Sequence, residues 1–108
     1  MQYSTLKKFF CGNIAGVKTT VYTVPTDDVQ GSSVVREMMV HNTDPNADVD
    51  FILYINDLVF VRATIQPGDS LLVGNEWYMV LDPGDSIAVE ATKANVINVF
   101  MSGSETFK

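Results

Sequence analysis

Two aspartates lie in nearly identical phrases, "IQPGDSLLV" from Ile65 and "LDPGDSIAV" from Leu81, sixteen residues apart. Two carboxylates held close together could perform acid–base catalysis or bind a metal ion. The same phrases fit tight turns, because Pro presets φ at the first central position and Gly adopts the positive φ of the second. We favour the turn interpretation, in which the structural turn residues are Pro67, Gly68, Asp69, Pro83, Gly84 and Asp85.

A calcium site is the alternative for these acids, together with Asp44, Asp48 and Asp50 of "DPNADVD". Calcium takes six to eight oxygen ligands, and a typical loop supplies them from alternating acidic positions. The spacing here does not match an EF-hand loop and lacks its glycine. We therefore expect no metal and no cofactor.

Other catalytic chemistry lacks the residues that it needs. The chain has one cysteine, Cys11, and one histidine, His41, so a nucleophilic pair would depend on these two meeting in the fold, and no intrachain disulfide can form. No Gly-rich phosphate loop, nucleophile elbow or zinc-binding helix motif is present. We expect a protein that is not an enzyme; an enzyme that relies on carboxylates alone is the remaining alternative.

The charge excludes a further class of partner. The formal net charge is −6, and the seven Lys and Arg residues are scattered, whereas nucleic-acid binding needs clustered cations. No stretch approaches a membrane span, and the N-terminus lacks the apolar core of a signal peptide. We expect no nucleic acid and no membrane as partner. With 46% hydrophobic and 19% charged residues, some apolar surface should instead meet another protein.

The fold can be predicted from the spacing of apolar runs and turn-forming residues along the chain. Short runs rich in Val, Ile, Thr, Tyr and Phe end at Pro, Gly, Asn or Asp within about ten residues. This favours one all-β domain over residues 1–108, a single antiparallel β-sandwich resembling a jelly roll, with about seven to nine strands. We expect the chain to reverse twice between the two PGDS turns, which places both at one end, and we expect a polar tail over residues 103–108.

Two segments allow more detailed predictions about a hairpin turn and about which face of a strand meets the core. In "VDFILYINDLVF", Asn56-Asp57 suits a tight hairpin, and the strand before it is apolar on both faces, so it is central or covered by another subunit. In "SVVREMMVHN" the alternation is imperfect, and the face that meets the core stays undetermined.

An exposed aromatic residue would suggest a different function. Trp77 or Tyr54 on a sandwich face could stack on a sugar, as in carbohydrate-binding modules. Trp77 and Tyr78 are adjacent, so only one of them can lie on a given face of a strand. A tryptophan among apolar strands is more often part of the core.

The stretch "TTVYTVPTDDVQGSSVVREMMVHNTDPNADVDFILYIND", followed later by "LDPGDSIAVEATKANVINVFMSGSE", resembles the small β-sandwich virion proteins of tailed bacteriophages. The similar features are a Val-Tyr-Thr-Val-Pro strand, a long strand running into Asn-Thr, a Pro-Gly-Asp turn and a final Asn-Val…Gly-Ser segment. The resemblance covers about residues 19 to 105 and implies no catalytic residue.

This resemblance implies a structural virion component, most simply a capsid decoration (cement) protein, with a tail, neck or fibre-associated protein as the alternative. A carbohydrate- or receptor-binding module, which rests on Trp77 or Tyr54 and not on the resemblance, is the alternative from another class. Its partners would be the major capsid or tail protein and further copies of itself. It would be made in the host bacterial cytoplasm and located in the virion. Residues 1–18 could form a contact arm between subunits, and the candidate interface residues are Phe9, Phe10, Tyr54 and Trp77.

Overall fold

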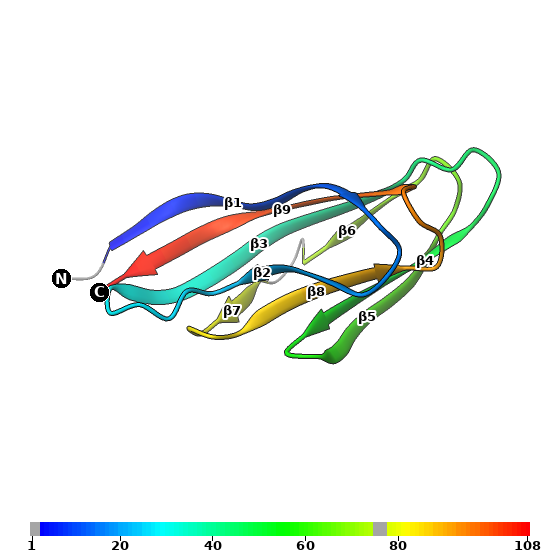
Figure 1. Cartoon of the computed structure of the whole chain (residues 1–108). Coiled ribbons are helices and arrows are strands. Elements are labelled where there is room, and N and C mark those ends of the chain that lie inside the picture. Colours follow the sequence, from blue (N-terminus) through cyan, green and yellow to red (C-terminus); the bar gives the residue numbers. More distant parts are fainter. Residues whose placement is uncertain (1–2, 75–77) are drawn as a thin grey trace.

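The computed structural model describes residues 3–74 and 78–108, which form nine strands in two antiparallel sheets (Figure 1). The first, called the β3 sheet, has the order β1-β9-β3-β6, and β7 also pairs with β3; the second, called the β4 sheet, has the order β2-β8-β4-β5. The predicted all-β sandwich is thus confirmed. The strands are β1 (Tyr3–Ile14), β2 (Thr19–Thr23), β3 (Gln30–Asn42), β4 (Val49–Ile55), β5 (Leu58–Ile65), β6 (Ser70–Val73), β7 (Met79–Leu81), β8 (Ser86–Ala91) and β9 (Ile97–Phe107).

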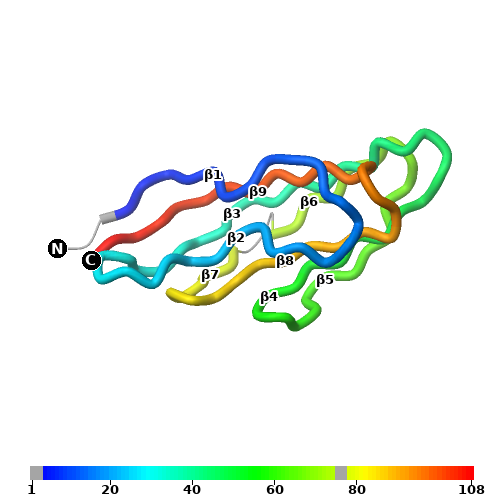
Figure 2. The backbone as a smooth tube through the Cα atoms, viewed as in Figure 1, coloured from blue at the N-terminus to red at the C-terminus, as the bar shows by residue number. Residues whose placement is uncertain are grey.

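Strands β6 and β7 share one edge of the β3 sheet. Both run antiparallel to β3, β6 against its C-terminal part and β7 against its N-terminal part, so they point the same way. The chain therefore keeps its direction from β6 to β7, and the two PGDS turns lie at opposite ends of the sandwich (Figure 2). The prediction that they share an end is wrong, because it required a reversal between these strands.

Each PGDS segment is a turn closed by its own backbone. The amide of Asp69 donates to the carbonyl of Gln66 at 3.0 Å, and the amide of Asp85 donates to that of Asp82 at 2.9 Å. Gly68 and Gly84 have φ angles of 76° and 92°. Proline before a positive-φ glycine is the arrangement of a type II turn.

The hairpin between β4 and β5 has the expected dipeptide at its tip, where Asn56 and Asp57 have φ angles of 50° and 64°. Two successive positive φ values define the type I′ turn that suits the twist of a hairpin. Strand β4 lies between β8 and β5, so it is central in its sheet. Its inward residues are fully buried, and outward-facing Ile52 is only 3% exposed, which explains a strand that is apolar on both faces.

Two irregularities in the β3 sheet lie close together. The register of β1 against β9 shifts opposite Ser102 and Met101, between Lys8 and Phe10, and that of β3 against β9 shifts opposite Gly103 and Ser102, between Val35 and Glu37. A further shift of β3 against β9 falls between Gln30 and Ser33. A bulge inserts one residue and changes which face the following residues take. This explains the imperfect alternation of β3, in which Val35 and then Met38 face the core.

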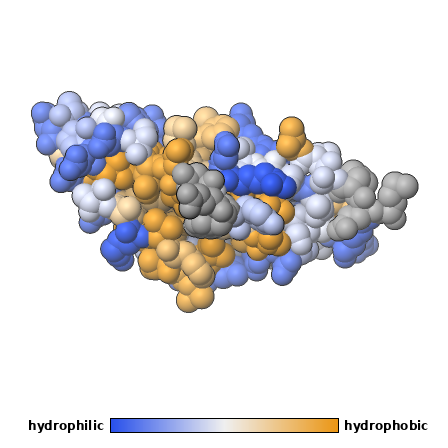
Figure 3. All heavy atoms as spheres, turned by 180° about the vertical axis from the view of Figure 1, so that it is seen from behind, coloured by the Kyte–Doolittle hydropathy of each residue, from blue (hydrophilic) through white to orange (hydrophobic). Residues whose placement is uncertain are grey.

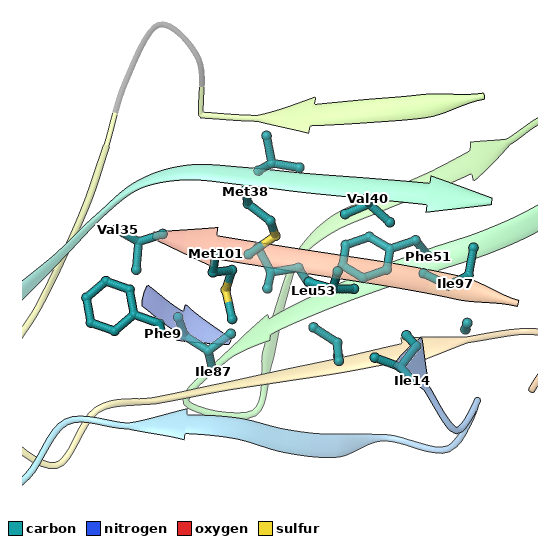
Figure 4. Packing of buried hydrophobic residues seen from close by; sticks show 14 of the residues in the cluster. Phe9, Ile14, Val35, Met38, Val40, Phe51, Leu53, Ile87, Ile97 and Met101 are labelled. Atoms are coloured by element: carbon teal, nitrogen blue, oxygen red, sulfur yellow. The ribbon is translucent and has the colours of Figure 1, made fainter. Parts of the chain in front are cut away.

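The core lies between the two sheets and is almost entirely aliphatic (Figure 4). Phe9 belongs to it: the side chain is 8% exposed, and its ring centroid lies 4.6 Å from that of Tyr22. Phe9 therefore packs inside the sandwich and is not a surface contact. The fully buried residues with the largest side chains are Phe51, Met38, Leu53, Ile87, Ile97 and Met101.

The C-terminal segment differs from its prediction. Strand β9 continues to Phe107 and pairs with both β1 and β3, so residues 103–107 are strand and not a loose tail. Ser104 and Glu105 are buried in it. The polar composition that suggested a tail comes from polar groups paired inside the sheet.

Gly103 should be the least replaceable residue of this strand. A Cβ on it would collide with the carbonyl oxygen of Val34 and approach the amide nitrogen of Arg36 to 3.0 Å, both of them backbone atoms that cannot rotate away. We predict that Gly103→Ala lowers the free energy of unfolding by about 2–4 kcal/mol, measured by urea denaturation.

Gly12→Ala is the matched control, since its added methyl would meet only the ring of Phe10, at 3.3 Å. It should cost less than about 1 kcal/mol. Equal losses for the two variants would show that the backbone at Gly103 is not the constraint.

Candidate functional surfaces

The PGDS aspartates do not form a pair. Asp85 stabilises its own turn: one carboxylate oxygen accepts from the Asp82 amide at 2.8 Å and the other from Nδ2 of Asn56 at 3.0 Å. These bonds, the Asn56 bond first, lower the pKa of Asp85 below its usual value. Asp69 lies at the opposite end, where its carbonyl accepts from the amide of Asn42 at 3.0 Å. Both residues hold turns in place, and a shared proton or metal is excluded by their separation.

The acids proposed for calcium are also engaged. Asp44, 4% exposed, accepts the amides of Asn46 at 2.8 Å and Ala47 at 2.9 Å and forms an ion pair with Lys93. Asp50 accepts from the hydroxyl of Thr64 at 2.6 Å. Across residues 3–74 and 78–108, no group of three or more His, Cys, Asp or Glu side chains could hold a metal ion.

One buried acid lies at the other end of the sandwich. Glu105 is 6% exposed and receives Lys7 Nζ at 3.1 Å, the Tyr22 hydroxyl at 3.2 Å and Nε2 of Gln30 at 3.5 Å. Tyr22 also shares a hydrogen bond of 2.7 Å with Ser33. Sequence reasoning missed this cluster, although the alternation of Met101, Gly103 and Glu105 along one strand could have revealed it. The cluster pairs the buried carboxylate of Glu105 with groups from β1, β2 and β3 at this end of the core.

Cys11 and His41 do not form a catalytic pair. Cys11 is exposed on β1 and His41 lies on β3, with β9 between the two strands. His41 Nδ1 instead shares a 2.8 Å hydrogen bond with Ser70. Within the described part of the chain, every buried side-chain nitrogen and oxygen atom has a hydrogen-bond partner, so none is left directed at a missing ligand.

Tyr54, one of the two aromatic residues considered for stacking on a sugar, has one face of its ring covered by a lysine. Lys18 Nζ lies 4.5 Å from the centroid of the Tyr54 ring and is held there by Asp57 at 2.8 Å. The Tyr54 hydroxyl donates to Glu90 at 2.6 Å. A ring covered by a lysine on one face is poorly placed to stack on a sugar. Trp77 lies outside the described residues.

The other proposed contact positions are on β1. Phe10 is half-buried and packs against the core. Residues 4–8 are exposed, and Leu6 is 91% exposed, but the strand is paired with β9 along its length. The N-terminal segment is therefore a sheet strand with an exposed outer surface, and its use as a contact arm stays a prediction.

An apolar surface lies where the sandwich is open, between the free edges of β5 and β7. A cavity of about 440 Å³ there is lined by side chains from both sheets. We call it the edge groove; its lining includes Leu53, Ile55, Phe60, Val61, Met79 and Val80. Phe60 is 61% and Val80 58% exposed on its rim. Figure 3 shows apolar side chains gathered on this side of the molecule. Contiguous exposed apolar patches are often sites of contact with another protein or a ligand.

A second apolar surface crosses the outer face of the β3 sheet. Successive strands place Cys11, Phe100, Met39 and Leu72 side by side, and we call these four residues the apolar row. The next row is polar and consists of Asn13, Asn98, His41 and Ser70. A shallow cavity of about 320 Å³ lies between the two rows.

The free edges of both sheets are irregular. Bulges leave Phe9 on β1, Val21 on β2 and Phe60 on β5 without a register partner, and the described part of the fourth edge consists of the short strands β6 and β7. Bulges and interruptions prevent strands of other chains from adding to a sheet. Contacts with partners are therefore expected on the groove and the faces, not by continuation of a sheet.

The chain matches no protein-family model and no characterised protein sequence. In structure it is similar to a protein described under "Bacillus endospore appendages form a novel family of disulfide-linked pili", at 11% identity and a TM-score of 0.47, over 100% of this chain and 87% of that one. Similarity also extends to infectious bursal disease virus, Gx strain, at 10% identity and a TM-score of 0.40, and to its VP2 subviral particle, at 12% and 0.37. The matches cover 98% of this chain but 32% of each viral chain.

Among residues 3–74 and 78–108, no helix has the length and apolar character that a membrane-spanning helix needs.

Lowering the pH should reveal how much the Asp44 carboxylate contributes to the stability of the folded state. The Lys93 ion pair, followed by the amide of Asn46, lowers its pKa from 3.8 to about 2. A carboxyl whose pKa falls on folding stabilises the folded state above its unfolded pKa, and this stability is lost as the pH falls through the folded pKa. We predict that Asp44→Asn is less stable than the parent at pH 7, and that the difference shrinks between about pH 4 and pH 2.

Urea denaturation at several pH values measures this difference. Asp48→Asn, an exposed acid of the same loop, is the control and should change stability little at any pH. A deficit of Asp44→Asn that is the same at pH 2 and pH 7 would contradict the assignment.

Proposed function

We propose that the protein is a non-enzymatic structural component of a tailed-phage virion, and specifically a capsid decoration (cement) protein. The observation that carries this proposal is the edge groove, a large exposed apolar surface on a sandwich whose buried polar groups are satisfied internally. A surface of this kind is suited to protein contact and offers no group for chemistry. The sequence resemblance to phage virion sandwiches points to the shell as the partner.

An arginine–aromatic contact lies next to strand β7, which lines the groove. Arg36 stacks over the ring of Tyr78 at 5.5 Å, and Tyr78 directly precedes Met79 of the groove lining. The chain as a whole carries a net charge of −6. Arginine and aromatic side chains are enriched where protein interfaces hold most of their binding energy.

The mechanism would be stabilisation by mass action. A protein that binds across junctions of the assembled shell, and not to free shell subunits, lowers the free energy of the assembled state by an amount that grows with the logarithm of its free concentration above Kd. Rigidity matters here, because a preorganised sandwich loses little conformational entropy on binding. A tail, neck or fibre position would use the same surface and mechanism at another place in the virion.

Binding to purified phage shells tests the proposal. The parent protein should co-sediment with shells to saturation at a fixed copy ratio and raise the temperature at which they rupture. Phe60→Ser, in the rim of the groove, should weaken binding by about tenfold or more, as expected for a buried aromatic contact.

Val17→Ser is the matched control, since Val17 is also exposed, at 69%, but lies in the link between β1 and β2. It should bind as the parent does. Shells that never retain the protein, or a Phe60→Ser variant that binds normally, would overturn the decoration role or its assignment to the groove, respectively.

A further inference from the structure

We propose that the outer face of the β3 sheet is a self-association surface, on which a second copy of the chain packs face to face about a two-fold axis parallel to the strands. This inference deepens the proposed function, because it names the surface through which copies of the structural subunit would meet. It rests on the apolar row, the polar row beside it and the distribution of charge.

Burial shows that both rows point away from the core. Met39 and Phe100 are 48% and 38% exposed, whereas their chain neighbours Val40 and Val99 are 0% and 2% exposed. Leu72 is 55% exposed, between two residues that are more buried. The apolar row is therefore a surface feature that spans four adjacent strands and plays no part in the packing between the two sheets.

The order of residues makes the face complementary to itself. The apolar row runs across β1, β9, β3 and β6. A two-fold axis between β9 and β3 places Phe100 opposite Met39 of the second copy, and Cys11 opposite Leu72. The same axis places Asn98 opposite His41. Apolar groups thus meet apolar groups and polar groups meet polar groups, which is the requirement for an isologous dimer.

Other orientations fit less well. An axis across the strands would set the polar row against the band that contains Lys8, Arg36 and Glu37. That arrangement would bury charged side chains against amides, which is costly without ion-pair partners. The axis parallel to the strands avoids this, and sheets stacked with their strands aligned within about 30° are a common packing mode.

The scarcity of acidic side chains on this face favours a second copy of the chain as the partner that binds there. Two molecules of net charge −6 repel each other unless they meet where acids are sparse. In the described part of this face, the central band has one acid, Glu37, against two cations, Lys8 and Arg36, and both rows lack charged acids. The face is the part of this acidic chain that another copy can approach without strong repulsion.

The polar row is already partly ordered. Nδ2 of Asn13 donates to Oδ1 of Asn98 at 2.9 Å, and His41 is bound to Ser70 at 2.8 Å. Side chains held before binding lose less entropy when a partner arrives. Four strands about 4.8 Å apart, over the four residues of β6 at about 3.3 Å each, cover on the order of 250 Å². This is below the roughly 800 Å² per partner of a standard interface, so association should be weak and depend on concentration.

Sedimentation velocity without shells tests the surface. The parent should shift from monomer towards dimer as the concentration rises through the micromolar to millimolar range. Met39→Glu should abolish the shift, because it adds a buried charge opposite Phe100. Leu6→Glu is the matched control, since Leu6 is 91% exposed on β1 of the same sheet but outside both rows, and it should dimerise as the parent does.

Cross-linking tests the orientation. The axis places position 72 of one copy opposite Cys11 of the other, so Leu72→Cys should form covalent dimers with a short bis-maleimide, each alkene adding one thiol. In the parent the two Cys11 residues are about 14 Å apart across the face, three strand spacings, and should cross-link poorly. The double variant Cys11→Ser/Leu72→Cys should also cross-link poorly.

Circular dichroism and urea denaturation establish that each variant is folded. A parent that stays monomeric at all concentrations would overturn the proposal. Dimerisation that survives Met39→Glu but is lost in Phe60→Ser would assign self-association to the edge groove instead and also overturn it. Because no shell is present, a failure here is distinct from a failure of shell binding.

Discussion

The fold depends on strand β9, which pairs along its length with both β1 and β3. Its pairing is possible only because Gly103 leaves room for the backbone of β3 where that strand bulges. The bulges of β1 and β3 meet at this level and turn Phe9 and Met38 into the core. Gly103, which has no side chain, thus sets the register of the β3 sheet. It also determines which residues of β1 and β3 face the core.

The same irregularity governs how the molecule can meet partners. Bulges on three edge strands and the short lengths of β6 and β7 discourage sheet continuation. The unpaired apolar surface is left on the open groove and on the outer face of the β3 sheet. A sandwich built this way can be displayed in many copies without polymerising through its edges, which suits a component of a regular particle.

The turn types could be predicted from the sequence, but the direction in which the chain runs after a turn could not. The Pro-Gly-Asp turns and the Asn56-Asp57 hairpin follow from backbone preferences of a few residues. The relative placement of the two turns depends on whether the chain reverses after Val73, and no short-range preference determines that. Glu105 was missed for a related reason: it is buried by partners such as Lys7 and Tyr22, which are distant in the sequence.

We expect apolar surfaces of the body, not strand edges, to carry the contacts of assembly. Image reconstruction of phage shells saturated with the protein would test this. Ordered density for the sandwich is expected at fixed junctions of the shell, with the Leu58–Phe60 region against the shell surface. Density in which a shell strand extends the sheet at β1 or β2, or no ordered density at saturation, would contradict it.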